Sequence, residues 1–298
     1  MSDFSKTLRF LILGDDGQAG QSLIQYLESR DIPYLSLSSL EVTNPTKLSD
    51  VAKLADQFFY IVNVLFEEPS EGVAANTDNW LALAIEVATL AKKLDKPLLY
   101  LSSSLVFSGK SVRAYVETDP TDSSSPLGLI YSDIEQQTVA IWPKTIVVRA
   151  GWLFSEQAGN FLTRLVGAAI SSESLNVSGN LKGCPTYSLT LARVLVAITE
   201  QVDCGAEPSL WGIYHYADSD ACTMHTFAKT VITVVKSMSE VRVENLIEGS
   251  TPTMIDAVTT TENYELSCKK ILSSFGIKQR PWRRSIHDVL KEKFASTE

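Results

Sequence analysis

The sequence is poor in cysteine and histidine, and neither type is arranged as a set of metal ligands. Its four cysteines, at positions 184, 204, 222 and 268, form no Cys-x-x-Cys pair, and its three histidines do not pair with them at metal-ligand spacing. Scattered cysteines of this kind are typical of reduced thiols in cytoplasmic proteins. The composition therefore predicts a cytoplasmic protein with neither a metal site nor a disulfide framework.

Long apolar runs and an excess of positive charge are also lacking. No apolar stretch approaches the roughly 18 residues that a transmembrane helix needs, and the first six residues are mainly polar. We therefore expect neither a membrane span nor a signal peptide. The 26 basic and 35 acidic residues give a net charge of −9, which argues against nucleic acid or an anionic membrane as the main partner.

A glycine-rich turn follows the first apolar run of the chain. Phe10–Leu13 reads as a buried strand, and Gly14, Gly17 and Gly20 follow it at GxxGxxG spacing. The first glycine suits a tight turn, the second a close approach of the backbone to a pyrophosphate, and the third close packing of the next helix. A helix that begins here offers N–H groups and a positive dipole end to phosphate. This order of strand, turn and helix predicts dinucleotide binding.

The first half of the chain alternates short apolar runs with helical patterns, which is typical of a parallel sheet wound with helices. Strand-like runs become sparse beyond residue 150, and no Pro/Gly linker marks a boundary. We predict an α/β fold, with a Rossmann-type doubly wound parallel sheet that binds NAD(P) over residues 1–150. Residues 151–298 are expected to form a smaller, interleaved substrate-binding region.

Short motifs in a fixed order extend over roughly residues 8–290. They are Leu13–Gly20, Leu40–Thr43, Ser102–Gly109, Tyr115–Asp119, Arg149–Trp152, Asn160–Phe161, Gly183–Tyr187, Gly212–His215, Phe275–Ile277 and Pro281–Arg283. In this order they resemble the dTDP-4-dehydrorhamnose reductases and their relatives among the extended short-chain dehydrogenases. The resemblance implies NADP or NAD as the cofactor and a nucleotide-sugar or another small molecule as the ligand.

The resemblance also implies roles for particular residues. In that family a Tyr protonates the substrate carbonyl as hydride arrives, a Lys four residues later lowers the pKa of the Tyr, and a Ser or Thr holds the carbonyl. By position, Ser103 and Tyr131 are the catalytic candidates. The implied cofactor contacts are Gly14, Gly17, Gln18, Ala19, Gly20, Glu41 and Asn63. The implied substrate contacts are Ser104, Trp152, Pro185 and Thr186.

The lysine of this catalytic pair is missing, because no lysine lies between positions 110 and 144. Counted forward from Pro126, Tyr131 falls on the catalytic Tyr and Glu135 on the Lys position. Counted backward from Arg149, Glu135 matches an acid that ends the motif. Tyr131 then takes the Lys position and Leu127 the Tyr position, or about one helical turn is deleted. A carboxylate near a Tyr raises its pKa, the reverse of what the reaction needs.

Two further departures bear on the cofactor. Residues 64–66, Val-Leu-Phe, replace the small residues that line the cofactor in the family. At the end of the second predicted strand, Ser36, Ser38 and Ser39 supply neither an acid for a ribose 2′-hydroxyl nor an arginine for a 2′-phosphate. The sequence therefore leaves the choice between NAD and NADP open.

Two functions of different classes follow. The chain is either an NAD(P)H-dependent reductase of a nucleoside-diphosphate 4-keto-6-deoxysugar, or a binding protein that has kept the fold without the reaction. The second alternative resembles the regulatory β subunit of methionine adenosyltransferase, and it implies a protein partner or a homodimer. Two buried polar residues are expected to be structural: Arg149 in an ion pair and His215 inside a strand.

Overall fold

The computed structural model describes residues 9–66, 77, 79–157, 159–205, 210–249 and 262–295. The polar N-terminal segment, on which the expectation of no signal peptide rests, lies outside these residues. Within them, no helix is both long and apolar enough to cross a membrane.

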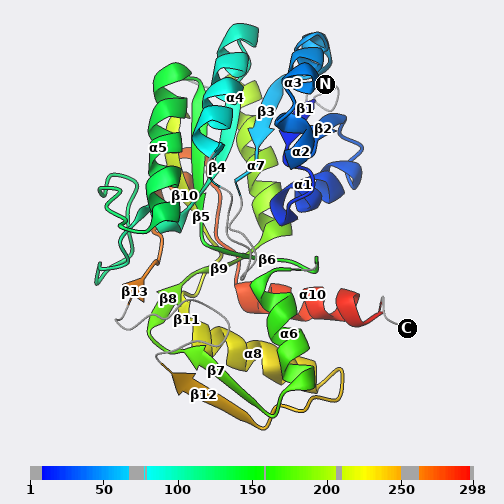
Figure 1. The fold of residues 1–298 in the computed structure, drawn as a ribbon, viewed down its shortest axis with the longest axis vertical. Helices are drawn as coiled ribbons and strands as arrows, with labels where there is room; N and C mark the ends of the chain where they lie inside the picture. The colour runs from blue at the N-terminus through cyan, green and yellow to red at the C-terminus, as the bar shows by residue number, and fades with distance from the viewer. Residues whose placement is uncertain are drawn as a thin grey trace.

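The centre of the molecule is a six-stranded sheet in which every neighbouring pair of strands is parallel (Figure 1). From one edge to the other, the strands are β10 (Gly212–Tyr216), β5 (Thr145–Ala150), β4 (Leu98–Ser103), β3 (Tyr60–Asn63), β1 (Phe10–Leu13) and β2 (Tyr34–Leu37). The chain reverses its direction of winding between β1 and β3, and ligands of open α/β sheets bind outside the carboxyl ends of the strands at such a switch point. The predicted doubly wound α/β fold is confirmed.

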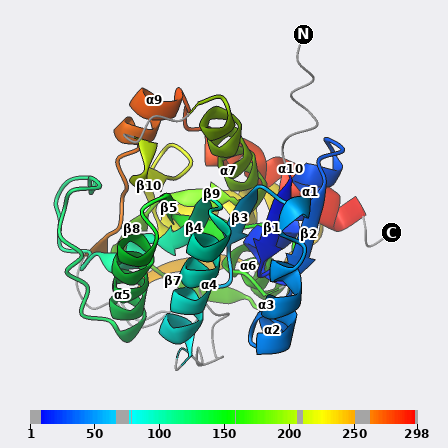
Figure 2. The ribbon, with the colours of Figure 1, turned by 90° about the horizontal axis from the view of Figure 1, so that it is seen from above.

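Helices cover both faces of this sheet, as Figure 2 shows from above. One face carries α2 (Ser39–Val42), α3 (Pro45–Ala52), α4 (Trp80–Leu94) and α5 (Pro126–Ile141). The other face carries α1 (Gln18–Glu28), α7 (Ser188–Asp203) and α9 (Lys269–Phe275). Because both faces are covered, β1, β3, β4 and β5 are buried along their whole length, which explains their continuous apolar runs.

The C-terminal half contributes to the central sheet and also builds a second layer of structure. Its strand β10 pairs with β5, and its helix α7 packs along α1. The rest forms the lower part of Figure 1. It consists of β6 (Trp152–Phe154), α6 (Phe161–Ser171), β7 (Ser174–Ser178), β8 (Leu181–Gly183), β9 (Pro185–Tyr187), β11 (Cys222–Thr223), α8 (Met224–Lys236), β12 (Asn245–Gly249), β13 (Glu262–Asn263) and α10 (Trp282–Ala295).

Helix α5 begins earlier than the sequence pattern indicates, and this matters for the candidate site. The pattern predicts a start near Ser132, whereas the helix starts at Pro126. The Ser125 side chain accepts a hydrogen bond from the Gly128 N–H at 3.0 Å, and proline suits the first helical position. Tyr131 therefore lies in the interior of the helix, on the side that faces the sheet.

Candidate functional site

The glycine turn after β1 has the close contacts that its spacing predicts. Gly14 has φ of +98°, and a Cβ there would lie 2.9 Å from the Cα of Leu65. A Cβ on Gly20 would overlap the carbonyl oxygen of Gly14. The Gly14 N–H donates to the Leu37 carbonyl at 2.8 Å, which joins the turn to the end of β2. Only glycine fits the first and third positions, so α1 can pack tightly against the sheet.

The N-terminus of α1 suits a phosphate group. Gly17 is its N-cap in an extended conformation, no side chain of the described residues caps it, and its first turn holds no acidic residue. Gln18 and Ala19 form that first turn, and the Gln18 Oε1 accepts a hydrogen bond from the Ser155 hydroxyl at 3.2 Å. Ser155, from the C-terminal half of the chain, therefore lies beside the N-terminus of α1, where the helix dipole favours an anion.

Two other predicted cofactor contacts lie at or just beyond the ends of β3 and β2, the strands on either side of β1. Asn63 ends β3, is 2% exposed, and accepts a hydrogen bond from the Leu65 N–H at 3.2 Å. Glu41 lies beyond β2, where its carboxylate accepts hydrogen bonds from the Ser38 N–H at 3.1 Å and the Ser38 hydroxyl at 3.2 Å. These bonds lower the pKa of Glu41 and complete a capping box at the start of α2.

The serines at the end of β4 are buried. The Ser103 side chain is 6% exposed and accepts a hydrogen bond from the Leu105 N–H at 3.2 Å, which caps a 3₁₀ turn over Ser104–Val106. Ser104 is 1% exposed. Ser103 lies opposite Ala150 in the register of β4 and β5. Both serines therefore lie at the carboxyl edge of the sheet.

Tyr131 is buried between α5 and the segment that follows β3. Its side chain is 1% exposed, and its hydroxyl donates to the Phe66 carbonyl at 2.6 Å. The Tyr131 ring lies 6.0 Å from the ring of Trp80, which in turn lies 5.2 Å from the ring of Phe66. Of the bulky residues after Asn63, Leu65 and Phe66 therefore pack in the cluster that contains Tyr131, whereas Val64 packs in the cluster on the other face of the sheet.

One helical turn after Tyr131, Glu135 forms a buried ion pair with Arg149. The Arg149 Nη2 donates to Oε2 at 2.6 Å and Nε donates to Oε1 at 2.9 Å, and both side chains are almost fully buried. The Ser102 hydroxyl donates to the same carboxylate. The structural ion pair expected for Arg149 is confirmed, and Glu135 faces the sheet.

His215 extends this polar group to the sheet edge. Ser102, Arg149 and His215 lie side by side in the registers of β4, β5 and β10. The His215 Nε2 lies 3.4 Å from the Arg149 Nη1. Burial, together with this cation, lowers the pKa of His215 to about 3, so the ring is neutral at pH 7.

The predicted substrate contacts on the C-terminal half lie in a two-stranded sheet formed by β6 and β9. Trp152 pairs with Pro185 in its register, and its half-buried indole packs against Gly183. Thr186 is fully buried, and its hydroxyl donates to the Cys184 carbonyl at 3.1 Å. The backbone of this pair lies close to Gly151, where a Cβ would overlap the Cys184 carbonyl oxygen.

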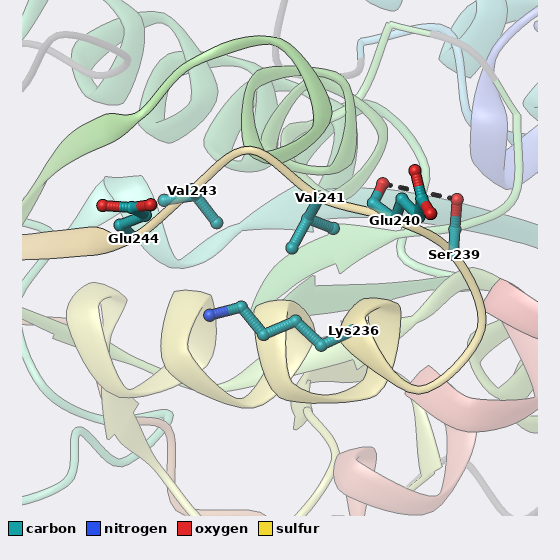
Figure 3. Close-up of a pocket in the computed structure, with 6 residues that line it drawn as sticks. All are labelled: Lys236, Ser239, Glu240, Val241, Val243 and Glu244. Carbon is teal, nitrogen blue, oxygen red and sulfur yellow. Dashed lines mark hydrogen bonds between the residues drawn. The ribbon is translucent and has the colours of Figure 1, made fainter.

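A surface pocket of about 660 Å³ lies elsewhere, between α8 and the loop that leads to β12 (Figure 3). In Figure 3, Lys236 extends along α8 beneath the loop. The lining residues are Lys236, Ser239, Glu240, Val241, Val243 and Glu244. None of them is a predicted site residue, so this pocket is not the candidate site. Within the described ranges, no group of three or more metal-ligating side chains is placed to hold a metal ion.

Three features of the site were missed by reasoning from the sequence. These are the hydrogen bond from Tyr131 to the Phe66 carbonyl, the Ser102 hydroxyl on Glu135, and a pair of contacts between Asp16 and Ser39. Each joins residues that are more than 20 positions apart in the sequence, so no local pattern signals them. Asp16 alone offered a hint, because it places a carboxylate inside the glycine turn.

The parallel sheet, its switch point and the glycine turn define a Rossmann-type fold with an added C-terminal region. The family model for the RmlD substrate binding domain matches residues 8–294. The chain therefore belongs to this family.

Known proteins agree with this assignment. A dTDP-4-dehydrorhamnose reductase from Aggregatibacter actinomycetemcomitans is 26% identical over 293 residues, covering 94% of this chain and 98% of the relative. The structure of the Bacillus anthracis dTDP-4-dehydrorhamnose reductase in complex with NADP matches with a TM-score of 0.79 at 20% identity, over 96% of this chain and 99% of that one. MoeE5 in complex with UDP-glucose and NAD matches with a TM-score of 0.76 at 12% identity, over 97% of this chain and 100% of that one. At these identities the two solved structures support the fold alone.

Proposed function

We propose that this chain binds a nicotinamide dinucleotide at the Gly14–Gly20 turn and a nucleotide-sugar beside it, but has lost the efficient proton transfer of the reductases. The observation that carries this proposal is the ion pair between Glu135 and Arg149. In this pair Glu135, the acidic residue that competes for the lysine position, is bound to Arg149. Helix α5 itself contains no lysine.

The ion pair also favours one of the two ways of matching the motif. If Glu135 stood at the lysine position, its carboxylate would be expected beside the cofactor at the sheet edge. Instead it lies against β4 and β5, bound to Ser102 and Arg149. We therefore assign Glu135 to the acid that ends the motif, Tyr131 to the lysine position and Leu127 to the tyrosine position.

Tyr131 itself is poorly suited to protonate a substrate. A general acid must present its proton to the reacting oxygen at hydrogen-bond distance, whereas the Tyr131 proton is donated to the Phe66 carbonyl in a buried site. Leu127 has no proton to give. Acid catalysis contributes roughly 10²–10⁴-fold to such reactions, and a loss of that size is what we expect relative to the reductases.

The dinucleotide site fits better than the catalytic site. The absence of side chains at Gly14 and Gly20 lets the turn and α1 pack closely against the sheet, and the positive dipole end at the N-terminus of α1 favours a pyrophosphate. A bound nicotinamide ring would supply hydride. The chain's own part is to hold the phosphates at Gly17 and Gln18 and to exclude water at the buried edge beside Ser103 and Ser104.

A charge placed at the N-cap tests dinucleotide binding. Gly17→Asp would put a carboxylate where the pyrophosphate is proposed to lie, while aspartate is itself a favourable N-cap. We expect NADH or NADPH to raise the thermal stability of the wild-type protein, by about 2.7 kcal/mol at 100 times Kd. The Gly17→Asp protein should lose this response without unfolding, and Gly17→Ser, which adds a neutral cap, should retain part of it.

Turnover is measured separately, as oxidation of NADPH or NADH with a dTDP-4-keto-6-deoxysugar. We expect a rate at least about 10²-fold below that of an active reductase of the family assayed in parallel. A wild-type protein with no response to either dinucleotide would refute the proposed binding, and full turnover would refute the proposed loss of catalysis.

A second function is consistent with the missing lysine. A member that holds nucleotide without rapid reaction can serve as a regulatory subunit, as the resemblance to the methionine adenosyltransferase β subunit implies. Measuring molar mass by light scattering with and without dinucleotide tests whether the chain forms a homodimer. Affinity capture from a lysate, with the Gly17→Asp protein as the comparison, tests for a partner that depends on bound nucleotide.

A further inference from the structure

The end of β2 carries a carboxylate that comes from another part of the chain. Asp16, inside the glycine turn, accepts hydrogen bonds through Oδ1 from the Ser39 N–H at 2.8 Å and from the Ser39 hydroxyl at 2.7 Å. The serines at this strand end supply no acid of their own. The tertiary structure thus provides the acidic group that is missing from the strand.

This carboxylate lies at a defined position of the fold. The N–H groups of Gly14 and Asp15 both donate to the Leu37 carbonyl, at 2.8 and 3.3 Å, so the glycine turn and the end of β2 are joined. In Rossmann-type folds the ribose of the adenosine half is recognised beyond the second strand. An acid there binds the 2′-hydroxyl of NAD, and an arginine accommodates the 2′-phosphate of NADP.

The other charges near this strand end form a pair of opposite signs. Glu41 keeps its pKa below the usual range through hydrogen bonds from Ser38, so it is ionised at neutral pH. The Lys47 ammonium lies 3.6 Å from the Glu41 carboxylate, and both side chains are largely exposed. That lysine is therefore partly neutralised by Glu41, whereas Asp16 is held in place by uncharged donors.

From these contacts we infer that Asp16 makes the chain selective for NADH over NADPH. The inference rests on the proposed dinucleotide site. A carboxylate fixed beside the ribose accepts a hydrogen bond from a 2′-hydroxyl and repels a 2′-phosphate, which carries about −1.5 to −2 charges at pH 7. The proposed preference for NADH differs from the Bacillus anthracis relative, whose structure is in complex with NADP.

The test compares the dissociation constants of NADH and NADPH, measured by titration calorimetry for the wild type and for Asp16→Asn. Asparagine keeps an oxygen for the two Ser39 donors and removes only the charge. We expect the wild type to bind NADH at least about tenfold more tightly than NADPH. In Asp16→Asn, NADPH should bind about tenfold more tightly than in the wild type, with NADH unchanged or weaker, so that the preference collapses.

Salt and a matched control separate charge from structure. Raising the salt from about 0.05 to about 0.5 M should shrink the wild-type preference and leave that of Asp16→Asn nearly constant, because salt screens exposed charges. Asp95→Asn removes the same charge at the amino end of the strands, just before β4. Asp95 has φ of +53°, a backbone conformation that asparagine tolerates. It should change neither constant.

The outcomes are distinguishable. Equal affinities, or tighter binding of NADPH by the wild type, would overturn the inference and leave the proposed dinucleotide site standing. If Asp16→Asn kept the preference for NADH, Asp16 would not be the residue that causes this preference. Binding of neither dinucleotide would overturn both the inference and the proposed function.

Discussion

The Arg149 guanidinium on β5 and the Glu135 carboxylate on α5 form a bidentate ion pair, with contacts of 2.6 and 2.9 Å, inside the molecule. The pair ties the helix to the centre of the sheet. Because Tyr131 precedes Glu135 by four residues, both side chains lie on the same face of α5. The pair therefore also fixes where Tyr131 points.

Breaking this pair from one side should be costly. In Glu135→Gln, the buried Arg149 keeps its charge and loses its partner, and we expect the free energy of unfolding to fall by about 3–5 kcal/mol in urea denaturation. Lys144→Gln is the matched control. It removes one partner of the exposed pair with Asp95 and should cost less than about 1 kcal/mol.

The double variant Glu135→Met with Arg149→Met replaces the pair by apolar side chains and should recover much of the stability lost in Glu135→Gln. If Glu135→Gln were as stable as the wild type, the pair would not be what holds α5 to the sheet.

The assignment of the motif can be tested by rebuilding it. Leu127→Tyr combined with Tyr131→Lys creates a Tyr and a Lys four residues apart in the register that we propose. We expect NAD(P)H oxidation with a 4-keto-6-deoxysugar nucleotide to rise at least about tenfold, because a lysine beside a tyrosine lowers its pKa. Glu135→Lys instead creates the Tyr–Lys pair of the other register, with Tyr131 as the tyrosine. In that variant the new lysine would place a second positive charge beside Arg149.

Glu135→Lys should therefore destabilise the protein by several kcal/mol without a gain in activity. A gain in Glu135→Lys, with none in the double variant, would show that Tyr131 is the catalytic tyrosine after all.

Two buried groups make opposite contributions to the dependence of stability on pH. The pKa of His215 is lowered to about 3, so its contribution to stability is present above the unfolded pKa of ~6.5 and is lost as the pH falls toward 3. Burial raises the pKa of Asp218 to about 6, so its contribution is present below the unfolded pKa of ~3.9 and is lost as the pH rises through 6.

Between about pH 4 and pH 6 these two slopes cancel, each being at most about 1.4 kcal/mol per pH unit. In Asp218→Asn, acidification from pH 6 to pH 4 should lower the free energy of unfolding more than in the wild type. In His215→Gln, the same change should lower it less or raise it. Urea denaturation at each pH measures both slopes, and identical slopes in the two variants would contradict this account.

The packing of the glycine turn predicts a contrast between two glycines. Gly20→Ala forces a methyl group into the Gly14 carbonyl, so we expect a large loss of stability and of dinucleotide binding. Gly167→Ala lies in α6, where a Cβ meets no atom within 4 Å. There, alanine should stabilise the protein by about 0.5–1 kcal/mol because it favours the helix. Thermal denaturation with and without NADH compares the two, and a tolerated Gly20→Ala would contradict the packing described for α1.

Much of the fold could be predicted from the sequence because its signals are local. The strand Phe10–Leu13 is predicted at its observed limits, and the helix expected at the glycine turn is α1. The short strands of the C-terminal half were underestimated. Strands β6 and β9 have three residues each, too few for a period of two to be recognised, and they are held by pairing with each other.

The candidate site divides in the same way. The sequence by itself determined the glycine turn, the missing lysine and the motifs whose order places the chain in its family, because each motif is a short run of consecutive residues. Only the tertiary structure decided three interactions. Glu135 forms an ion pair with Arg149, the Tyr131 hydroxyl donates to the Phe66 carbonyl, and the Asp16 carboxylate accepts a hydrogen bond from the Ser39 N–H. These contacts join separate elements, and their partners are selected by packing and by the cost of burying an unpaired charge or polar group.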